Sequence, residues 1–490
     1  MGASPTTRWQ VGGHRFLVRR LEHALVRRES RMINEPLRSR SRALMVGAVI
    51  AALGLAASAA LAFVRPQDKM GDAVIVIGKD SGAMYVVDND VVHPVMSLAS
   101  ARLIAGQPDD PVTVKESELA TRARGPLVGI PGSPTSLAVD PGSATATWTV
   151  CDKVDPDASA VATTAVLVTD SPVDARGEMV PLGADGALLW EYEGTTFLVY
   201  GGVRARIDMA NAAVTRALGV DGAVPSPVSA ALLDSVREVP PLVPPVVTGA
   251  GQPTPYRFGG LTVGSVASVD LGDREQYYVA LVDGVQPIAP ATAQLLRFAD
   301  SQGRVGLESI TPDTLDSAPQ TRNPLPVTTF PENIPRLVDV DAAPVACLSW
   351  RAQPVESDQA STTATVEITT GRTLPLDDDE RAVDLAGADG PGPALDAVFV
   401  KPGSGYFVQT TGVGEDIARR DAMFYVADTG VRFGIPDLES AKALGFDDAA
   451  VAPWAIVSLC AQGPALGRSQ ARVAHDGVDP DRDASELGGG

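Results

Sequence analysis

The sequence predicts a mixed α/β protein with a single-pass membrane anchor, followed by a β-rich outer part that contains an internal duplication. Three observations lead to this fold class. An uncharged stretch of 22 residues lies near the N-terminus, similar segments recur almost 200 positions apart, and Gly (47) and Pro (39) are frequent among the 490 residues. Frequent Gly and Pro favour short elements joined by many turns over long helices. The chain is long enough for two or more domains.

The uncharged stretch covers 43–64 and reads ALMVGAVIAALGLAASAALAFV. As a helix it would span about 33 Å, enough to cross a bilayer core of about 30 Å. Residues 1–42 carry ten arginines against three glutamates, a net charge of +7, whereas the whole chain carries −20. The positive-inside rule therefore predicts a cytoplasmic N-terminus and an outer location for the chain after residue 65. A signal peptide cleaved near 57–59 is the alternative, but its leader and apolar stretch would be unusually long.

The basic arm over 1–42 contains a stretch with helical periodicity, HRFLVRRLEHALVRRESRM. Its apolar residues fall on one stripe, which includes Leu17, Leu21 and Leu25. Arg19 and Arg27 lie on the adjoining face. Such an amphipathic helix can lie on anionic lipid headgroups, or it can dock on the cytoplasmic surface of a partner protein. The sequence leaves both hypotheses open.

The outer part contains pairs of similar segments at a nearly constant distance. WTVCD at 148–152 is echoed by VACLSW at 345–350, where Cys347 follows Cys151 by 196 positions. Three more pairs have offsets of 199, 194 and 193: ATTAVLV with STTATVEI, GEMVPL with GRTLPL, and MYVVDNDVVHPV with YYVALVDGVQPI. A near-constant offset over so many residues indicates an internal duplication.

A smaller unit also recurs inside each half. It consists of a strand with an aromatic residue and valines, a polar turn, another valine-containing strand and a short apolar helix, and it occurs four times. We therefore predict two halves about a pseudo-twofold axis, each with the order repeat, core half, repeat. The expected bounds are 74–134, 135–185 and 186–254, then 268–336, 337–395 and 396–466. A polar tail over 467–490 is expected to be disordered.

The duplication also predicts how the three cysteines are used. Equivalent strands can pair across a local pseudo-twofold axis, which would bring Cys151 and Cys347 close together. In an oxidising outer compartment the two would form a disulfide that closes a loop of about 195 residues. Cys460 lies in the apolar stretch WAIVSLC and is expected to be a buried free thiol.

Short motifs that resemble catalytic ones have structural explanations. VADTGV at 426–431 and KDSG at 79–82 resemble the paired motifs of aspartic proteases, but the repeat alignment places Asp428 in a hairpin turn and Asp80 before a strand. The stretch IGKD contains Gly-Lys but lacks the rest of a P-loop. The four histidines are scattered and form no metal-binding pattern. The net charge of −20 argues against nucleic acid as a partner.

The leader RFLVRRLEHALVRRES, one membrane helix, the segment from MYVV to SLASARLI, and four repeats around a disulfide-linked core resemble the EccB family. This family belongs to the type VII (ESX) secretion systems of mycobacteria and related actinobacteria. The resemblance covers nearly the whole chain, from Thr7 to about Leu466. It implies a structural subunit of an inner-membrane secretion complex, with an elongated periplasmic scaffold. The implied partners are the EccC motor ATPase, EccD, EccE, the mycosin protease and other EccB copies.

Two other classes of function stay open at this point. Small β/α repeats are a common design for binding repetitive polymers, so the outer part could anchor the complex to peptidoglycan. Members of the family are sometimes labelled ATPases, but these residues supply no nucleotide-binding motif. We therefore expect a non-enzymatic subunit without catalytic residues, metal ions or cofactors.

Overall fold

The structure is a computed structural model that describes residues 7–28, 36–64, 70–155, 157, 160–170, 172–173, 179–272, 274–353, 363–390, 392 and 394–478. Helix α1 (Arg8–Arg27) lies in the basic arm, and α2 (Pro36–Val64) contains the uncharged stretch. Within the described residues, Arg42–Ala60 is the one helical segment long and apolar enough to cross a membrane. The anchor expected over 43–64 is therefore a helix.

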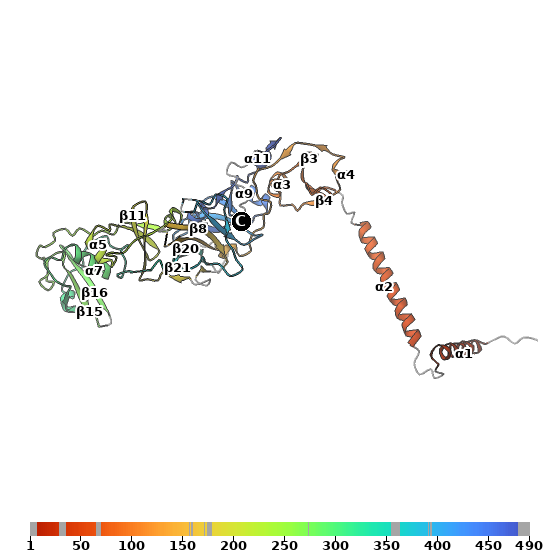
Figure 1. The fold of residues 1–490 in the computed structure, drawn as a ribbon, viewed down its shortest axis with the longest axis horizontal. Helices are drawn as coiled ribbons and strands as arrows, with labels where there is room; N and C mark the ends of the chain where they lie inside the picture. The colour runs from red at the N-terminus through yellow and green to blue at the C-terminus, as the bar shows by residue number, and fades with distance from the viewer. Residues whose placement is uncertain are drawn as a thin grey trace, which may run out of the picture.

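Beyond residue 70, the described chain forms six β-sheets along an elongated body (Figure 1). Four of these sheets share one pattern of pairing. Three consecutive strands form an antiparallel meander, a helix follows, and the next strand pairs in parallel with the first strand of the meander. In three of the four, a second helix then leads to a strand that is parallel to the third. We call these sheets and their helices units 1 to 4.

The elements of the units are as follows. Unit 1 contains β1 (Ile75–Gly78), β2 (Met84–Asp88), β3 (Val91–Pro94), α3 (Leu98–Ala105), β4 (Val112–Val114), α4 (Glu116–Leu119) and β5 (Ala123–Arg124). Unit 2 contains β10 (Gly186–Tyr192), β11 (Thr195–Tyr200), β12 (Val203–Ile207), α5 (Ala212–Ala217), β13 (Ser226–Pro227), α6 (Ala230–Ser235) and β14 (Arg237–Val239), and β19 (Arg336–Leu337) also pairs with β10. Unit 3 contains β15 (Val266–Asp270), β16 (Glu275–Leu281), β17 (Gly284–Ile288), α7 (Pro290–Ala299), β18 (Glu308–Ile310) and α8 (Pro312–Asp316). Unit 4 contains β24 (Gly405–Thr411), β25 (Met423–Ala427), β26 (Val431–Ile435), α9 (Leu438–Leu444), β27 (Ala450–Pro453), α10 (Trp454–Val457) and β28 (Ala461–Gln462).

A seven-stranded core sheet has the order β22-β23-β8-β7-β20-β21-β9. Its strands are β7 (Thr147–Asp155), preceded by the short helix η1 (Ser143–Thr145), then β8 (Ala160–Thr169), β9 (Val180–Pro181), β20 (Val345–Ala352), β21 (Ala364–Gly371), β22 (Val383–Asp384) and β23 (Ala397–Val400). The two halves of the chain exchange strands in this sheet. β9 comes from the first half and pairs with β21 of the second, whereas β23 comes from the second half and pairs with β8 of the first. The complete sheet therefore requires both halves.

The units pack in pairs through the helix that follows each meander. α3 of unit 1 packs against α9 of unit 4, and α5 of unit 2 packs against α7 of unit 3. Leu103 of α3 and Leu444 of α9 are both fully buried at the first of these contacts. The resulting order along the body is unit 1, unit 4, core sheet, unit 2 and unit 3 (Figure 1). The chain thus runs outward to unit 3 and returns toward unit 1.

Two predicted bounds inside the body need correction. β15 begins at Val266, before the expected start of the third repeat at 268. Phe258 and Leu261 are already buried in one cluster with Ala267 of this strand, so the packing of unit 3 begins earlier still. β23 falls in the segment assigned to the fourth repeat, but its pairing with β8 makes it a strand of the core sheet. Repeat composition does not reveal which sheet a connecting strand joins.

The expectation of a disordered tail over 467–490 is wrong for residues 467–478. These residues contain α11 (Arg468–Ala471) and β29 (Ala474–His475), which pairs with β6 (Leu127–Val128) next to unit 1. The order of this segment comes from a contact with a distant helix: Arg468 donates a hydrogen bond to the carbonyl of Leu103 in α3 at 3.2 Å. The polar composition of the segment gives no sign of this contact. Residues 479–490 lie outside the described residues.

Candidate functional site

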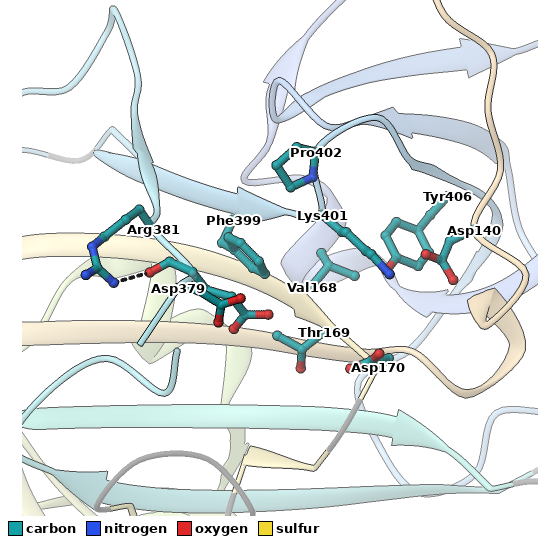
Figure 2. Close-up of a pocket in the computed structure, with 11 residues that line it drawn as sticks. Asp140, Val168, Thr169, Asp170, Asp379, Arg381, Phe399, Lys401, Pro402 and Tyr406 are labelled. Atoms are coloured by element: carbon teal, nitrogen blue, oxygen red, sulfur yellow. Dashed lines mark hydrogen bonds between the residues drawn. The ribbon is translucent and has the colours of Figure 1, made fainter. Parts of the chain in front are cut away.

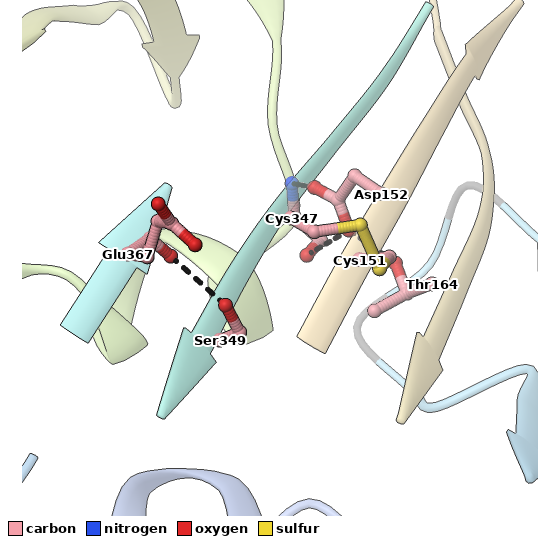
Figure 3. The surroundings of a disulfide bond; sticks show 7 residues. Cys151, Asp152, Thr164, Cys347, Ser349 and Glu367 are labelled. Atoms are coloured by element: carbon pink, nitrogen blue, oxygen red, sulfur yellow. Dashed lines mark hydrogen bonds between the residues drawn. A yellow bond between two sulfur atoms is a disulfide. The ribbon is translucent and has the colours of Figure 1, made fainter. Parts of the chain in front are cut away.

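The centre of the core sheet brings Cys151 and Cys347 together. β7 and β20 are antiparallel neighbours in which Cys347 lies directly opposite Cys151. A disulfide joins the two sulfur atoms at 2.03 Å, with the Cα atoms 4.1 Å apart (Figure 3). Both residues are fully buried, and 196 positions separate them in the chain. Because so long a loop is closed, the bond restricts the unfolded chain strongly.

The two tryptophans near these cysteines follow from antiparallel pairing rather than from the duplication. Trp148 stands three residues before Cys151, whereas Trp350 stands three residues after Cys347. A duplication preserves order along the chain, and at the offset of 196 the position equivalent to Trp148 is Pro344. Antiparallel pairing reverses the order and places Trp350 opposite Trp148. Since side chains alternate between the faces of a strand, the indoles pack on one face and the disulfide on the other.

On the tryptophan face, Asp152 links the core sheet to unit 2. Its carboxylate accepts hydrogen bonds from the Ser229 backbone N–H at 2.7 Å, the Ser229 hydroxyl at 2.8 Å and the Thr164 hydroxyl at 3.0 Å. Ser229 is also the N-cap of α6, where its hydroxyl accepts from the N–H of Leu232. Asp152 is 2% exposed, and burial raises its pKa to about 6, although the hydrogen bonds from Ser229 and Thr164 oppose this rise.

Asp396 adds a second buried carboxylate to this cluster. It accepts hydrogen bonds from the backbone N–H groups of Thr164 at 2.7 Å, Gly390 at 2.8 Å and Asp389 at 3.1 Å. Thr164 pairs with Asp152 across β7 and β8, so it bridges the two carboxylates. The sequence analysis did not single out this cluster. The one available signal was Asp152 itself, a carboxylate that directly follows the stretch WTVC in β7.

Unit 4 packs on the same face through α10, without a buried charge at its start. α10 has no side-chain N-cap, and its Ile456 is fully buried in the cluster that holds the tryptophans. Trp454 begins the helix, is 43% exposed and stacks on Phe424 with ring centroids 5.3 Å apart. The guanidinium of Arg432 lies 5.6 Å from the Trp454 ring. This joint therefore depends on apolar and aromatic packing.

An arginine on the third strand of the meander holds the second helix in both units 2 and 4. Arg204 donates a hydrogen bond to the carbonyl of Leu233 in α6. Arg432 donates to the carbonyl of Cys460, just beyond α10. Carbonyl groups near a helix end need such donors, since no later turn supplies them. Arg204 also forms two ion pairs at 3.2 Å, with Asp234 and Glu238.

Cys460, the third cysteine of the chain, is a buried free thiol. It is 1% exposed, and burial raises its pKa to about 12, against an opposing effect of the Arg432 guanidinium. A thiol with this pKa stays protonated at neutral pH and is a poor nucleophile.

A cavity of about 380 Å³ lies at the end of β8, beside unit 4 (Figure 2). The buried rings of Phe399 and Tyr406 form part of its wall. The charged groups around it are Asp140, Asp170, Asp379, Glu380, Arg381 and Lys401. Among the described residues, no serine, cysteine or histidine lines it, and no group of three or more metal-binding side chains occurs.

The two aspartates of the protease-like motifs have structural partners. Asp428 lies in the turn between β25 and β26 and accepts the backbone N–H of Gly403 at 2.7 Å. Asp80 lies in the β1–β2 connection of unit 1, where its backbone N–H donates to Glu116 at 3.0 Å. Each aspartate therefore belongs to a turn of a different unit.

The five residues predicted for contact by the arm all lie on α1. Leu17, Leu21 and Leu25 are 57%, 62% and 78% exposed, and Arg19 is exposed as well. Arg27 is the last residue of the helix. The leucines recur at a spacing of four and so share one side of α1. The side of α1 that the sequence predicts to contact a partner or lipid is therefore exposed among the described residues.

Comparison with known proteins gives a consistent result over the whole length. The family described as "Type VII secretion system ESX-1, transport TM domain B" matches residues 3–480. A protein named ESX-3 secretion system ATPase EccB3, from Mycolicibacterium smegmatis, is 37% identical over 98% of this chain and 93% of its own length. A protein named ESX-1 secretion system ATPase EccB1, from Mycobacterium tuberculosis, is 34% identical over 98% of this chain and 97% of its own.

Solved structures agree with the sequence relatives. A chain of an intact ESX-5 inner-membrane complex is 34% identical and matches with a TM-score of 0.73 over 99% of both chains. The EccB3 dimer from the ESX-3 core complex is 36% identical and matches with a TM-score of 0.69 over 82% of this chain and 100% of that one. The first of these matches extends over nearly the whole chain, so it includes both the anchor and the body with its core sheet. The chain therefore belongs to the EccB family of type VII secretion proteins, which are core components of the ESX inner-membrane complex.

Proposed function

We propose that this chain is the rigid periplasmic scaffold of an ESX inner-membrane complex and supports protein export through it. The exchange of strands in the core sheet is the observation that carries the proposal. β9 pairs with β21 and β23 pairs with β8, so the units on either side of the core are joined through one hydrogen-bonded sheet. A sheet shared in this way resists separation of its halves, as a scaffold requires. A disulfide adds a covalent tie at its centre.

We further propose that the four units are copies of one ancestral unit, arranged as two halves about a pseudo-twofold axis between β7 and β20. Three observations support this arrangement. The four units share one pattern of strand pairing. Cys151 and Cys347 stand at the duplication offset and lie opposite each other. α6 and α10 occupy the same place in their units and contact one another on one face of the core sheet.

The proposed orientation places the N-terminus in the cytoplasm and the body in the periplasm. The charge of +7 over 1–42, against −20 for the whole chain, supports it. The test uses single cysteines at two exposed positions, Thr7→Cys and Asp476→Cys, in intact cells. A membrane-impermeant thiol reagent that reaches the periplasm should label the second variant and leave the first unlabelled until the cells are lysed. Labelling of the first variant alone would overturn the orientation.

The proposed partners are the EccC motor ATPase, EccD, EccE, the mycosin protease and further copies of this chain. The solved EccB3 dimer supports contact between copies. Nucleotide hydrolysis is not part of the proposal, although the names of the relatives include the word ATPase. The sequence has no P-loop that would hold the phosphates. Mass spectrometry of the detergent-solubilised chain should recover a motor ATPase with it, and recovery without any other ESX component from cells that assemble the complex would contradict the scaffold role.

For α1 we propose docking on a cytoplasmic partner, because three exposed leucines share one side of the helix. The double variant Leu21→Glu and Leu25→Glu should lose complex assembly but keep membrane insertion, since α2 is unchanged. A matched control, His23→Glu with Val26→Glu, adds the same two charges to the opposite side and should assemble normally. Normal assembly of the leucine variant would mean that this side of α1 contacts only lipid.

A further inference from the structure

We propose that the joint between the core sheet and unit 2 is linked to proton binding: uptake of one proton by the cluster of Asp152, Thr164 and Asp396 tightens the docking of α6, and its release loosens the docking. The cluster lies where three segments meet. Asp152 comes from β7, Asp396 directly precedes β23, and Ser229 caps α6 of unit 2. Since unit 3 packs on unit 2, the joint also carries the far end of the body.

Asp396 is the one charged group that acts on the carboxylate of Asp152 among its described neighbours. On β20 its neighbour is Ala346, and on β8 it is Thr164, neither of which is charged. Lys153, the next residue of β7, is exposed and points to the other face of the sheet. Asp396 remains, and repulsion between the two carboxylates favours proton uptake by Asp152.

The helix that packs against the cluster brings no compensating positive charge. α6 contributes the hydroxyl and N–H of Ser229, and its one acidic residue, Asp234, is 75% exposed and paired with Arg204. Arg204 in turn is held by Glu238 as well as by Asp234. An ionised Asp152 is therefore stabilised by hydrogen bonds alone while it is buried beneath α6.

The sign of the effect follows from the shift in the pKa of Asp152. Burial raises this pKa from 3.8 to about 6, so the docked state holds the proton more tightly than a state in which α6 has moved away and water reaches the carboxylate. Docking is consequently strongest below the solvated pKa of 3.8 and weakens as the pH rises through about 6.

The hydrogen-bond geometry accommodates both protonation states. In the ionised state both oxygens of Asp152 accept, Oδ2 from the Ser229 N–H and Oδ1 from two hydroxyls. When a proton from solvent binds Oδ1, that oxygen can donate to the hydroxyl of Ser229 or Thr164, which rotates to accept. The bond from the Ser229 N–H is kept, so no rearrangement of the backbone is needed.

The experiment is amide hydrogen exchange of the full chain in detergent at pH 5 and pH 7.5, corrected for the intrinsic exchange rates. α3 of unit 1 is the internal control, because it packs on α9 in a different buried cluster, whereas α10 contacts α6 itself. The protection of α6 relative to α3 should be about tenfold greater at pH 5 than at pH 7.5. An equal ratio at the two pH values would overturn the proposal.

Two variants identify the group that binds the proton. Asp152→Asn resembles the protonated state, so its α6 should be as well protected at pH 7.5 as at pH 5. A pH dependence that survives in this variant would overturn the assignment. If Asp152→Asn does not fold, Asp396→Asn decides: loss of the neighbouring charge should move the midpoint of the α6 transition to lower pH, and an unchanged midpoint would count against the proposal.

Discussion

The joints of units 2 and 4 with the core sheet have the same topology but different chemistry. In both, a short helix packs on the tryptophan face, and an arginine binds a carbonyl near its end. α6 is capped by Ser229, which binds the buried Asp152, whereas α10 begins at the half-exposed Trp454 without a side-chain cap. A buried polar cluster is strong only while all its members are paired, whereas apolar packing responds to shape alone. Joints at equivalent positions of a repeated fold can thus differ in their chemistry, so that a change of protonation weakens one of them and a change of side-chain shape weakens the other.

The two ends of the body differ as well. Units 1 and 4 are tied by the C-terminal segment, in which Arg468 donates to the carbonyl of Leu103 and β29 pairs with β6. Units 2 and 3 are joined by the packing of α5 on α7 and by β19, which pairs with β10. At the end near unit 1, the C-terminal segment therefore holds two units together. We expect the joint between unit 2 and the core sheet to open before the joint between unit 4 and the core sheet.

The largest expected effect is the loss of the central bridge, which should weaken both joints together. Cys347→Ser should lower the stability of the core sheet by up to about 4–5 kcal/mol in the chain-entropy model. Cys151→Ser should have the same effect, and the double variant should lose little more, because either change opens one bond. Amide protection of β7 and β20 in the full chain is the measurement. Additive losses in the double variant would show that the cysteines act separately.

Removal of a buried leucine or isoleucine should separate the two joints. Leu232→Ala in α6 and Ile456→Ala in α10 each remove a fully buried side chain from the same cluster, at a cost of about 2–5 kcal/mol. Although α6 and α10 contact one another, each helix is anchored in its own unit, so each variant should lose amide protection mainly in its own unit. An equal loss of protection in both units would mean that the two joints open as one.

Loss of Arg204 should lower the stability of the protein more than loss of Arg432. Arg204→Met removes a helix-end hydrogen bond and the ion pairs with Asp234 and Glu238, of which Glu238 keeps its pair with Arg206, at a cost of about 1–3 kcal/mol. Arg432→Met removes a hydrogen bond and a cation–π contact, at a cost of about 1–2 kcal/mol. Thermal unfolding of the two variants in detergent measures the difference. A larger shift for Arg432→Met would contradict the ranking.

The smallest effect is expected at the edge of the unit 4 joint. Trp454→Ala removes a stacked ring that is already 43% exposed, so we expect a cost of about 1 kcal/mol and no change in the protection of α6. Trp148→Ala, at a fully buried position, should cost about 3–5 kcal/mol and serves as the comparison. Similar costs for the two would mean that Trp454 is covered in the assembled protein.

Features that leave a repeated or uniform pattern could be predicted from the sequence. The uncharged stretch indicated the anchor, and the offset of 196 between Cys151 and Cys347 indicated which strands are neighbours. The reversed order of the tryptophans was present in the sequence too, but its meaning required the antiparallel register.

Features that depend on packing between distant segments could not be predicted. β9 is only two residues long, Val180–Pro181, and so short a strand has no periodicity to reveal that it pairs with β21. Asp152 and Asp396 lie 244 positions apart and meet only through the exchanged strand β23. The C-terminal segment is polar, and its order comes from contacts with α3 rather than from its own composition.

Non-reducing peptide mapping of the full chain tests most directly the claim that the two halves meet at equivalent strands. The protein is extracted from membranes in detergent after free thiols have been alkylated, so that no exchange occurs during digestion. We predict one linked peptide pair, containing Cys151 and Cys347, and an alkylated Cys460. A bond from Cys460 to either of the other two, or three alkylated thiols in oxidised protein, would contradict the pairing of β7 with β20 and the scaffold built on it.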